Sequence, residues 1–169
     1  ANQISSLGDY KIDSKGVGIR FGIPFTEFDK IFFGTKYEAT DINLGLSPPR
    51  RFEIYCIPYL PDCSTNSLVL SLGWVRDSRD NGLAPNKGTL QRANFDYATP
   101  IGEVEYARLT YEIQWFLPVT KNITYATNLE TGYGFPLGGA EYPIFKNFYA
   151  GGIGSLRGFA NRSIGEKDE

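Results

Sequence analysis

The chain has 169 residues, of which 41% are hydrophobic and 21% are charged, enough for one globular domain or for one piece of a larger one. Lysine and arginine number 17 against 19 aspartates and glutamates, so neither a basic nucleic-acid-binding face nor an acidic interaction tail is indicated. The absence of histidine and the presence of only two cysteines exclude imidazole bases, histidine-ligated metals and thiolate zinc sites.

The rest of the composition favours β-sheet, because 19 glycines, 11 tyrosines and 12 phenylalanines dominate it. Every apolar run is shorter than the ~18 residues that a membrane-spanning helix needs. A helical membrane protein is therefore excluded, whereas a β-barrel is not. The first residue is alanine, and no signal-peptide pattern follows it, so we expect a processed or excised chain.

Alternation of apolar and polar residues at period two recurs six times between turn signals, and helical spacing is hard to find. The first predicted strand, at about residues 16–24, places Val17, Ile19 and Phe21 on one face and Arg20 among glycines on the other. We predict the remaining strands at about residues 30–44, 67–76, 88–99, 104–117 and 121–134. The predicted fold is all-β, an antiparallel up-and-down meander of about six strands.

The charged residues that we place in the middle of these strands fall on the polar face. They are Arg20, Lys36, Glu38, Arg92, Asp96, Arg108, Glu112 and Glu130. Because successive side chains of a strand point to opposite sides of the sheet, one face of the predicted sheet is apolar and the other is wet.

Two architectures produce a sheet with one apolar and one wet face. One is a soluble sandwich or lipocalin-like barrel, and the other is a transmembrane barrel whose apolar face meets lipid. Two features favour the membrane barrel. The long links fall at one end of the predicted meander and mostly short turns at the other. Aromatic side chains lie near the ends of the apolar faces, at Tyr37, Trp74, Tyr97, Trp115 and Tyr133.

The end of the chain is a glycine-rich segment at residues 135–165, which is too long for an ordinary loop without a function. Its run Phe148-Tyr149-Ala150-Gly151-Gly152 and its tetrad Leu156-Arg157-Gly158-Phe159 resemble the sixth loop of the BamA family of outer-membrane insertases. The tetrad begins with Leu where the family has Val. Upstream, residues 21–25 and the turn around Arg79 and Asp80 are similar to the same family.

This resemblance implies a domain organisation. Residues 1–169 would be a fragment of a C-terminal outer-membrane β-barrel domain, with strands at about 16–134 and the long loop at 135–165. The POTRA domains and the remaining strands would lie outside the chain, so the fragment is expected to be a partial transmembrane β-barrel. Six strands are fewer than the smallest closed barrels contain, and we expect the fragment to self-associate through its edges or apolar faces.

The resemblance also implies a function and its partners. The parent protein would assist folding and insertion of β-barrel clients in the bacterial outer membrane, without enzymatic chemistry, cofactor or metal. Its partners would be outer-membrane lipid, client proteins and accessory lipoproteins bound through the POTRA domains, with no nucleic acid. The alternatives are a TamA-like or two-partner secretion translocation barrel, and a soluble ligand-binding β-barrel.

The functional loop motif implied by the resemblance comprises Gly151, Gly152, Leu156, Arg157, Gly158 and Phe159. We expect Gly158 in a turn that needs an unusual backbone angle. A guanidinium inside a wet lumen needs carboxylate partners, so Arg157 is hypothesised to be solvated or to pair with Glu130, Glu112 or Asp96.

Cys56 and Cys63 both lie in the long second link, at a spacing that suits a local disulfide. An outer-membrane protein crosses an oxidising periplasm, which favours pairing, with two free thiols as the alternative. A disulfide here would stiffen the link rather than the sheet.

Overall fold

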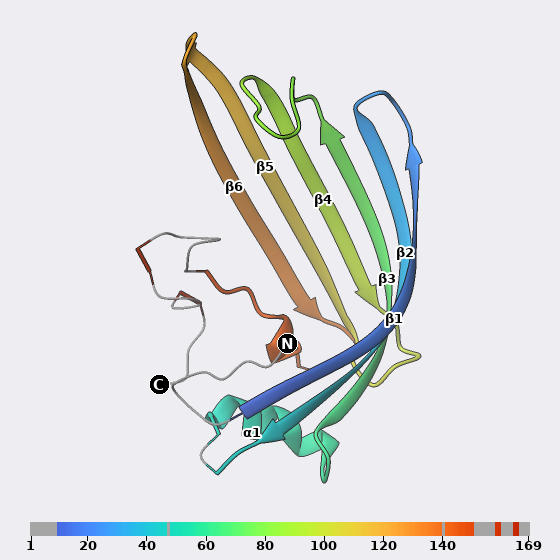
Figure 1. Cartoon of the computed structure of the whole chain (residues 1–169). Coiled ribbons are helices and arrows are strands. Elements are labelled where there is room, and N and C mark those ends of the chain that lie inside the picture. Colours follow the sequence, from blue (N-terminus) through green and yellow to red (C-terminus); the bar gives the residue numbers. More distant parts are fainter. Residues whose placement is uncertain (1–9, 47, 140, 151–157, 160–163, 166–169) are drawn as a thin grey trace.

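The computed structural model describes residues 10–46, 48–139, 141–150, 158–159 and 164–165. Six strands form one antiparallel sheet in which each strand pairs with the next along the chain (Figure 1). The strands are β1 (Tyr10–Pro24), β2 (Asp29–Leu44), β3 (Ser64–Asp77), β4 (Gly88–Ala98), β5 (Tyr106–Thr120) and β6 (Ile123–Pro136). The predicted all-β meander is confirmed.

The links between strands differ at the two ends of the sheet (Figure 1). Residues 25–28, 78–87 and 121–122 connect strands at one end, called here the hairpin end. Residues 45–63 and 99–105 lie at the other end, together with the chain after Pro136. The link at 45–63 contains a short helix, α1 (Arg50–Cys56), and a 3₁₀ turn, η1 (Ile57–Tyr59), so we call this the helical end.

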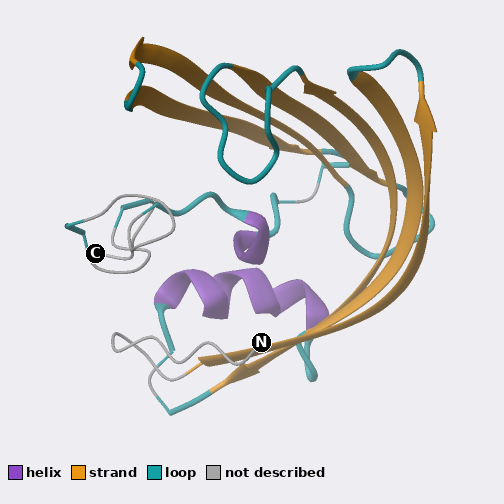
Figure 2. Ribbon diagram, turned by 45° about the horizontal axis from the view of Figure 1, so that its top comes forward, coloured by secondary structure: helices purple, strands orange, loops and turns teal. Residues whose placement is uncertain are grey.

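The sheet is strongly curved, and α1 lies inside its curve together with a second 3₁₀ turn, η2 (Ile144–Lys146) (Figure 2). The helices in the described part of the chain are too short or too polar to cross a membrane. The concave, inner face of the sheet is thus partly covered by the chain itself, whereas none of the described helices or 3₁₀ turns lies on the convex, outer face.

The outer face carries the apolar side chains of the predicted alternation. Leu109 is 48% exposed, Val17 74% and Tyr133 68%. The register continues this surface across all strands, for example from Phe33 through Leu72, Phe95 and Leu109 to Tyr133. Water contact with so much apolar surface is unfavourable, since each Å² costs about 25 cal/mol. A soluble ligand-binding barrel would place these side chains inside, so the structure argues against that alternative.

Polar partners appear on the outer face near the hairpin end. Trp74 Nε1 donates a hydrogen bond to Asp29 at 3.1 Å, and the Tyr111 hydroxyl donates to Gln91 at 2.9 Å. Arg76 also reaches Asp29, at 3.5 Å. Rings with an apolar body and a hydrogen-bonded tip are typical of a membrane–water interface.

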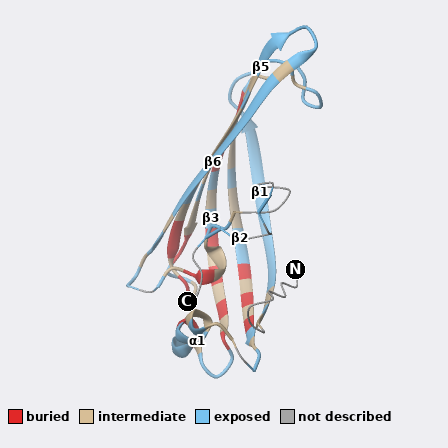
Figure 3. Ribbon diagram, turned by 90° about the vertical axis from the view of Figure 1, so that its left-hand side faces the viewer, coloured by how far each residue is buried: buried red, intermediate tan, exposed pale blue. Residues whose placement is uncertain are grey.

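The alternation reverses its phase at the helical end, where β1 begins at Tyr10 rather than at the predicted residue 16. From Lys11 to Lys15 the outer face is charged, with Lys11 and Asp13 2.6 Å apart, whereas Ile12 points inward and packs with Ile42 beneath α1. Figure 3 shows the buried residues gathered at this end of the sheet. The predicted start of β1 was too late because the prediction required apolar residues to stay on the same face along the whole strand. Where the strand leaves lipid, its outer face meets water and its inner face meets a core, so the apolar residues change face.

The outer-face assignment predicts how the tryptophans respond to quenchers. The only two, Trp74 and Trp115, both lie on the outer face. In lipid vesicles, the Trp74→Phe variant should show Trp115 fluorescence quenched by brominated acyl chains and hardly by aqueous acrylamide. Thr110→Trp in a chain without both native tryptophans is the inner-face control. Quenching of Trp115 by acrylamide alone would contradict the assignment.

Candidate functional site

The charged residues predicted on the polar face share the concave side of the sheet. Seven of them line a single open hollow there, namely Arg20, Lys36, Arg92, Asp96, Arg108, Glu112 and Glu130. Glu38 lies on the same face towards the helical end and is 7% exposed. The sheet therefore separates an outer surface suited to lipid from an inner surface suited to water.

Partners on the same strand or on a neighbouring one hold many of these charges in place. Arg92 and Glu112 form an ion pair at 3.1 Å, and Gln114 donates a hydrogen bond to Glu112 at 2.7 Å. Asp96 accepts a hydrogen bond from Ser71 at 2.6 Å. The guanidinium of Arg20 stacks 4.4 Å from the centre of the Phe32 ring. These contacts order the inner wall, and they use two of the carboxylates hypothesised to pair with Arg157.

Two aromatic side chains that follow β6 dock onto the inner wall at glycines. A Cβ on Gly132 would overlap the Phe148 ring, and one on Gly134 would overlap Tyr142. Phe148 also stacks 4.5 Å from the Arg108 guanidinium. The glycines of β6 thus provide the space in which Tyr142 and Phe148 pack against the sheet.

An ion pair joins this docked segment to the opposite side of the sheet. Lys146 Nζ lies 3.1 Å from each carboxylate oxygen of Glu38, and Lys36 donates to the same carboxylate at 2.9 Å. Glu38 belongs to β2 and Gly134 to β6, two strands that are not neighbours. The segment therefore crosses the inner face from β6 to β2.

A small apolar core lies beneath α1 at the helical end. Tyr55 and Cys56 of α1 pack with Ile42, Cys63 and Ile144 of η2. The helix was not predicted, although Phe52, Tyr55 and Cys56 stand at the i, i+3 and i+4 spacing of a helical face. Burial raises the pKa of the Tyr55 phenol above its usual range.

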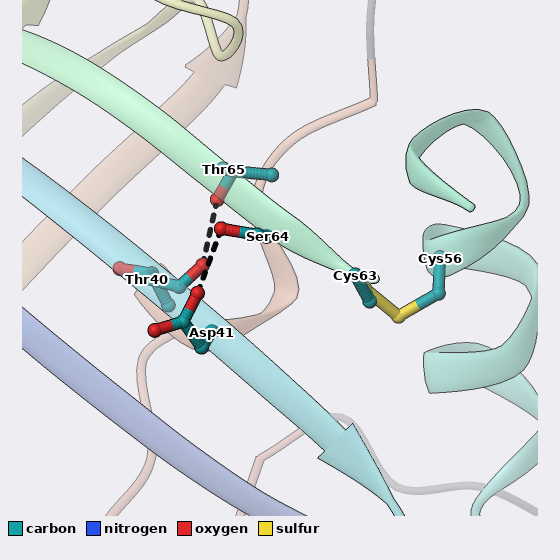
Figure 4. Close-up of a disulfide and its surroundings, with 6 residues drawn as sticks. All are labelled: Thr40, Asp41, Cys56, Cys63, Ser64 and Thr65. Carbon is teal, nitrogen blue, oxygen red and sulfur yellow. Dashed lines mark hydrogen bonds between the residues drawn. A yellow bond between two sulfur atoms is a disulfide. The ribbon is translucent and has the colours of Figure 1, made fainter. Parts of the chain in front are cut away.

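Cys56 and Cys63 form a disulfide that ties the end of α1 to the residue before β3 (Figure 4). Beside it, Ser64 donates a hydrogen bond to Asp41 at 2.7 Å, and the Thr65 hydroxyl donates to the Thr40 carbonyl at 3.5 Å. The disulfide thus joins the small core to the start of the β2–β3 ladder.

The predicted loop motif falls partly outside the described residues, which leave out Gly151, Gly152, Leu156 and Arg157. Gly158 has a φ of +94°, in the left-handed region that the sequence analysis expected for it, and Phe159 is 55% exposed. A β-bridge joins Ala150 to Ile164 through hydrogen bonds of 2.8 and 3.0 Å. This bridge brings together the two ends of the segment that carries the motif.

Comparison with family models matches residues 1–169 to the Omp85 superfamily domain. The chain belongs to the Omp85 superfamily. With its apolar outer face and polar inner face, this Omp85 chain forms part of an outer-membrane β-barrel, as predicted.

Individual curated proteins are also similar to this chain. The outer membrane protein assembly factor BamA of Neisseria meningitidis serogroup B is 31% identical over 96% of this chain, which covers 21% of that protein. The mouse sorting and assembly machinery component 50 homolog is 34% identical over 59% of this chain, and the match covers 22% of the mouse protein. The Omp85 chain thus spans about a fifth of the length of the curated relatives it matches.

A solved structure shows the same fold. The crystal structure of BamA from Haemophilus ducreyi lacking POTRA domains 1–3 superposes with a TM-score of 0.83 at 24% identity. The match covers 94% of this chain and 32% of that one.

Removing the disulfide should loosen the helical end without unfolding the sheet. The double variant Cys56→Ser and Cys63→Ser loses a short covalent ring, which stabilises the folded chain by about 2.5 kcal/mol in the chain-entropy treatment. We expect faster proteolysis within residues 45–63 and unchanged strand content by circular dichroism. Equal protease resistance of the variant and the oxidised parent would contradict this.

Proposed function

We propose that this chain is the middle part of a longer bacterial outer-membrane β-barrel that assists the folding and insertion of other β-barrel proteins. The main support is the docked segment, residues 141–150, held against the polar inner face of a sheet whose outer face suits lipid. The similarity to an assembly factor named BamA over 96% of the chain supports this function.

The sheet itself supports the existence of further strands. β1 and β6 are the two edge strands of the described sheet. In the hydrocarbon region, backbone N–H and C=O groups need partners, which only a closed barrel supplies to every strand. We therefore propose that additional strands close the barrel, and that POTRA domains precede it.

The proposed activity is non-enzymatic. Client strands would gain backbone hydrogen bonds by pairing with strand edges of the complete barrel, in a lipid environment where unpaired groups are costly. The proposed partners are outer-membrane lipid, client β-barrels and accessory lipoproteins bound through the POTRA domains. Arg157 and its neighbours in the loop motif would act from the lumen, where Arg157 needs carboxylate or water partners.

Reconstitution tests the function directly. The full-length protein that contains this chain, in lipid vesicles, should accelerate the folding of a urea-denatured outer-membrane β-barrel client. Folding is followed by the mobility shift of the unheated client on gels, and empty vesicles are the control. An equal client folding rate in both kinds of vesicle would rule out the proposal, and release of client into the vesicle lumen would indicate translocation instead.

The 169-residue chain on its own should self-associate when detergent is removed. Its two edge strands and its exposed outer face both favour contacts with other copies. Light scattering should report oligomers in buffer and small, discrete particles in detergent. A strictly monomeric chain in buffer without detergent would contradict this expectation.

A further inference from the structure

The ion pair between Glu38 and Lys146 joins residues 108 positions apart in the sequence. The exposed fractions of the two side chains are 9% and 16%, so both charges are largely removed from water. Lys36 already lies 2.9 Å from the Glu38 carboxylate. Of these two cations, Lys146 is the one that is largely buried and that comes from outside β2, so its contact with Glu38 also ties the docked segment to that strand.

Contacts on the other side of η2 hold Lys146 in place. Ile144 is 8% exposed and packs in the core beneath α1. The Tyr142 hydroxyl donates a hydrogen bond to the Lys146 carbonyl at 3.4 Å, and the Tyr142 ring meets Tyr106 edge-on at 5.8 Å. Lys146 is thus presented to β2 by a short, packed turn.

The aromatic contacts fix the segment at β6, where Gly132 and Gly134 receive Phe148 and Tyr142, but they leave its position against β2 to other contacts. A cation held between two carboxylate oxygens is satisfied at a single place. Fixing one register among similar apolar arrangements is the best-attested use of a buried ionic group. Beyond Lys146, the chain reaches the bridge between Ala150 and Ile164, which joins the ends of the motif segment.

We propose that Glu38 and Lys146 are positioning residues that set the height of the Ala150–Ile164 bridge on the inner wall of the barrel. They would thereby hold residues 141–150 and the bridge where client assembly requires them. This inference rests on the proposed function and extends it to residues outside the Arg-Gly-Phe motif.

The test is a charge reversal in the full-length protein. Lys146→Glu and Glu38→Lys each place like charges together. The double variant restores the ion pair, and the summed charge of positions 36, 38 and 146 is then the same as in the parent. Lys146→Arg is the conservative variant, and Lys121→Glu, at the exposed β5–β6 turn, is the matched control.

Two readouts are taken on each variant in vesicles. Spin labels at Leu129→Cys, on the outer face of β6, and at Ile164→Cys, at the bridge, report their distance by pulsed electron paramagnetic resonance. Cys56 and Cys63 are joined in the disulfide and do not react. The second readout is the rate of client folding.

We expect a narrow distance distribution in the parent, the Lys121→Glu control and Lys146→Arg. Each single reversal should broaden or shift it and slow client folding about tenfold, and the double variant should restore both. Single reversals that leave the distances unchanged, or a double variant that restores neither readout, would overturn the inference.

The remaining outcomes separate this inference from the proposed function. If single reversals change the distances while clients fold at the parent rate, the pair positions the bridge but client assembly does not require that position, so the inference fails and the proposed function stands. If the parent protein itself does not accelerate client folding, the proposed function fails, and the inference that rests on it fails too.

Discussion

The structure depends on one requirement of the lipid environment: backbone polar groups must be paired within the protein, while the side chains that meet acyl chains must be apolar. Antiparallel strands meet both conditions, because the ladder pairs the backbone and alternation sends every second side chain outward. In this chain the same rule places Leu109 and Leu129 outside and Glu112 and Glu130 inside. The apolar outer face and the polar inner face of the sheet therefore follow from lipid on one side and water on the other.

The inner face obeys a different requirement, because its charged side chains need polar partners and no packed core covers most of them. Ion pairs such as Arg92–Glu112 and a chain segment that lies across the wall meet this need. At Gly132 and Gly134 of β6, the lack of a side chain leaves room for the docked Phe148 and Tyr142. The docked segment is thereby held against the inner face at two places, by aromatic contacts at β6 and by an ion pair at β2.

At the helical end the environment changes, and the fold changes with it. Charges move to the outer face of β1, and apolar side chains such as Ile12 and Ile42 turn inward onto α1. This small core resembles that of a soluble protein and is joined by the Cys56–Cys63 disulfide. Because η2 contributes Ile144 to the same core, the helical end and the docked segment form one structural unit.

Sequence alone determined the strand order and the two faces, because period-two alternation and turn residues are local signals that lipid and water impose on each strand separately. Tertiary structure decided the positions of α1 and η2 and the pairing of Glu38 with Lys146. Those contacts join distant residues, and they exist because the curvature of six paired strands brings the chain after β6 back across β2. No spacing rule along the sequence encodes that return.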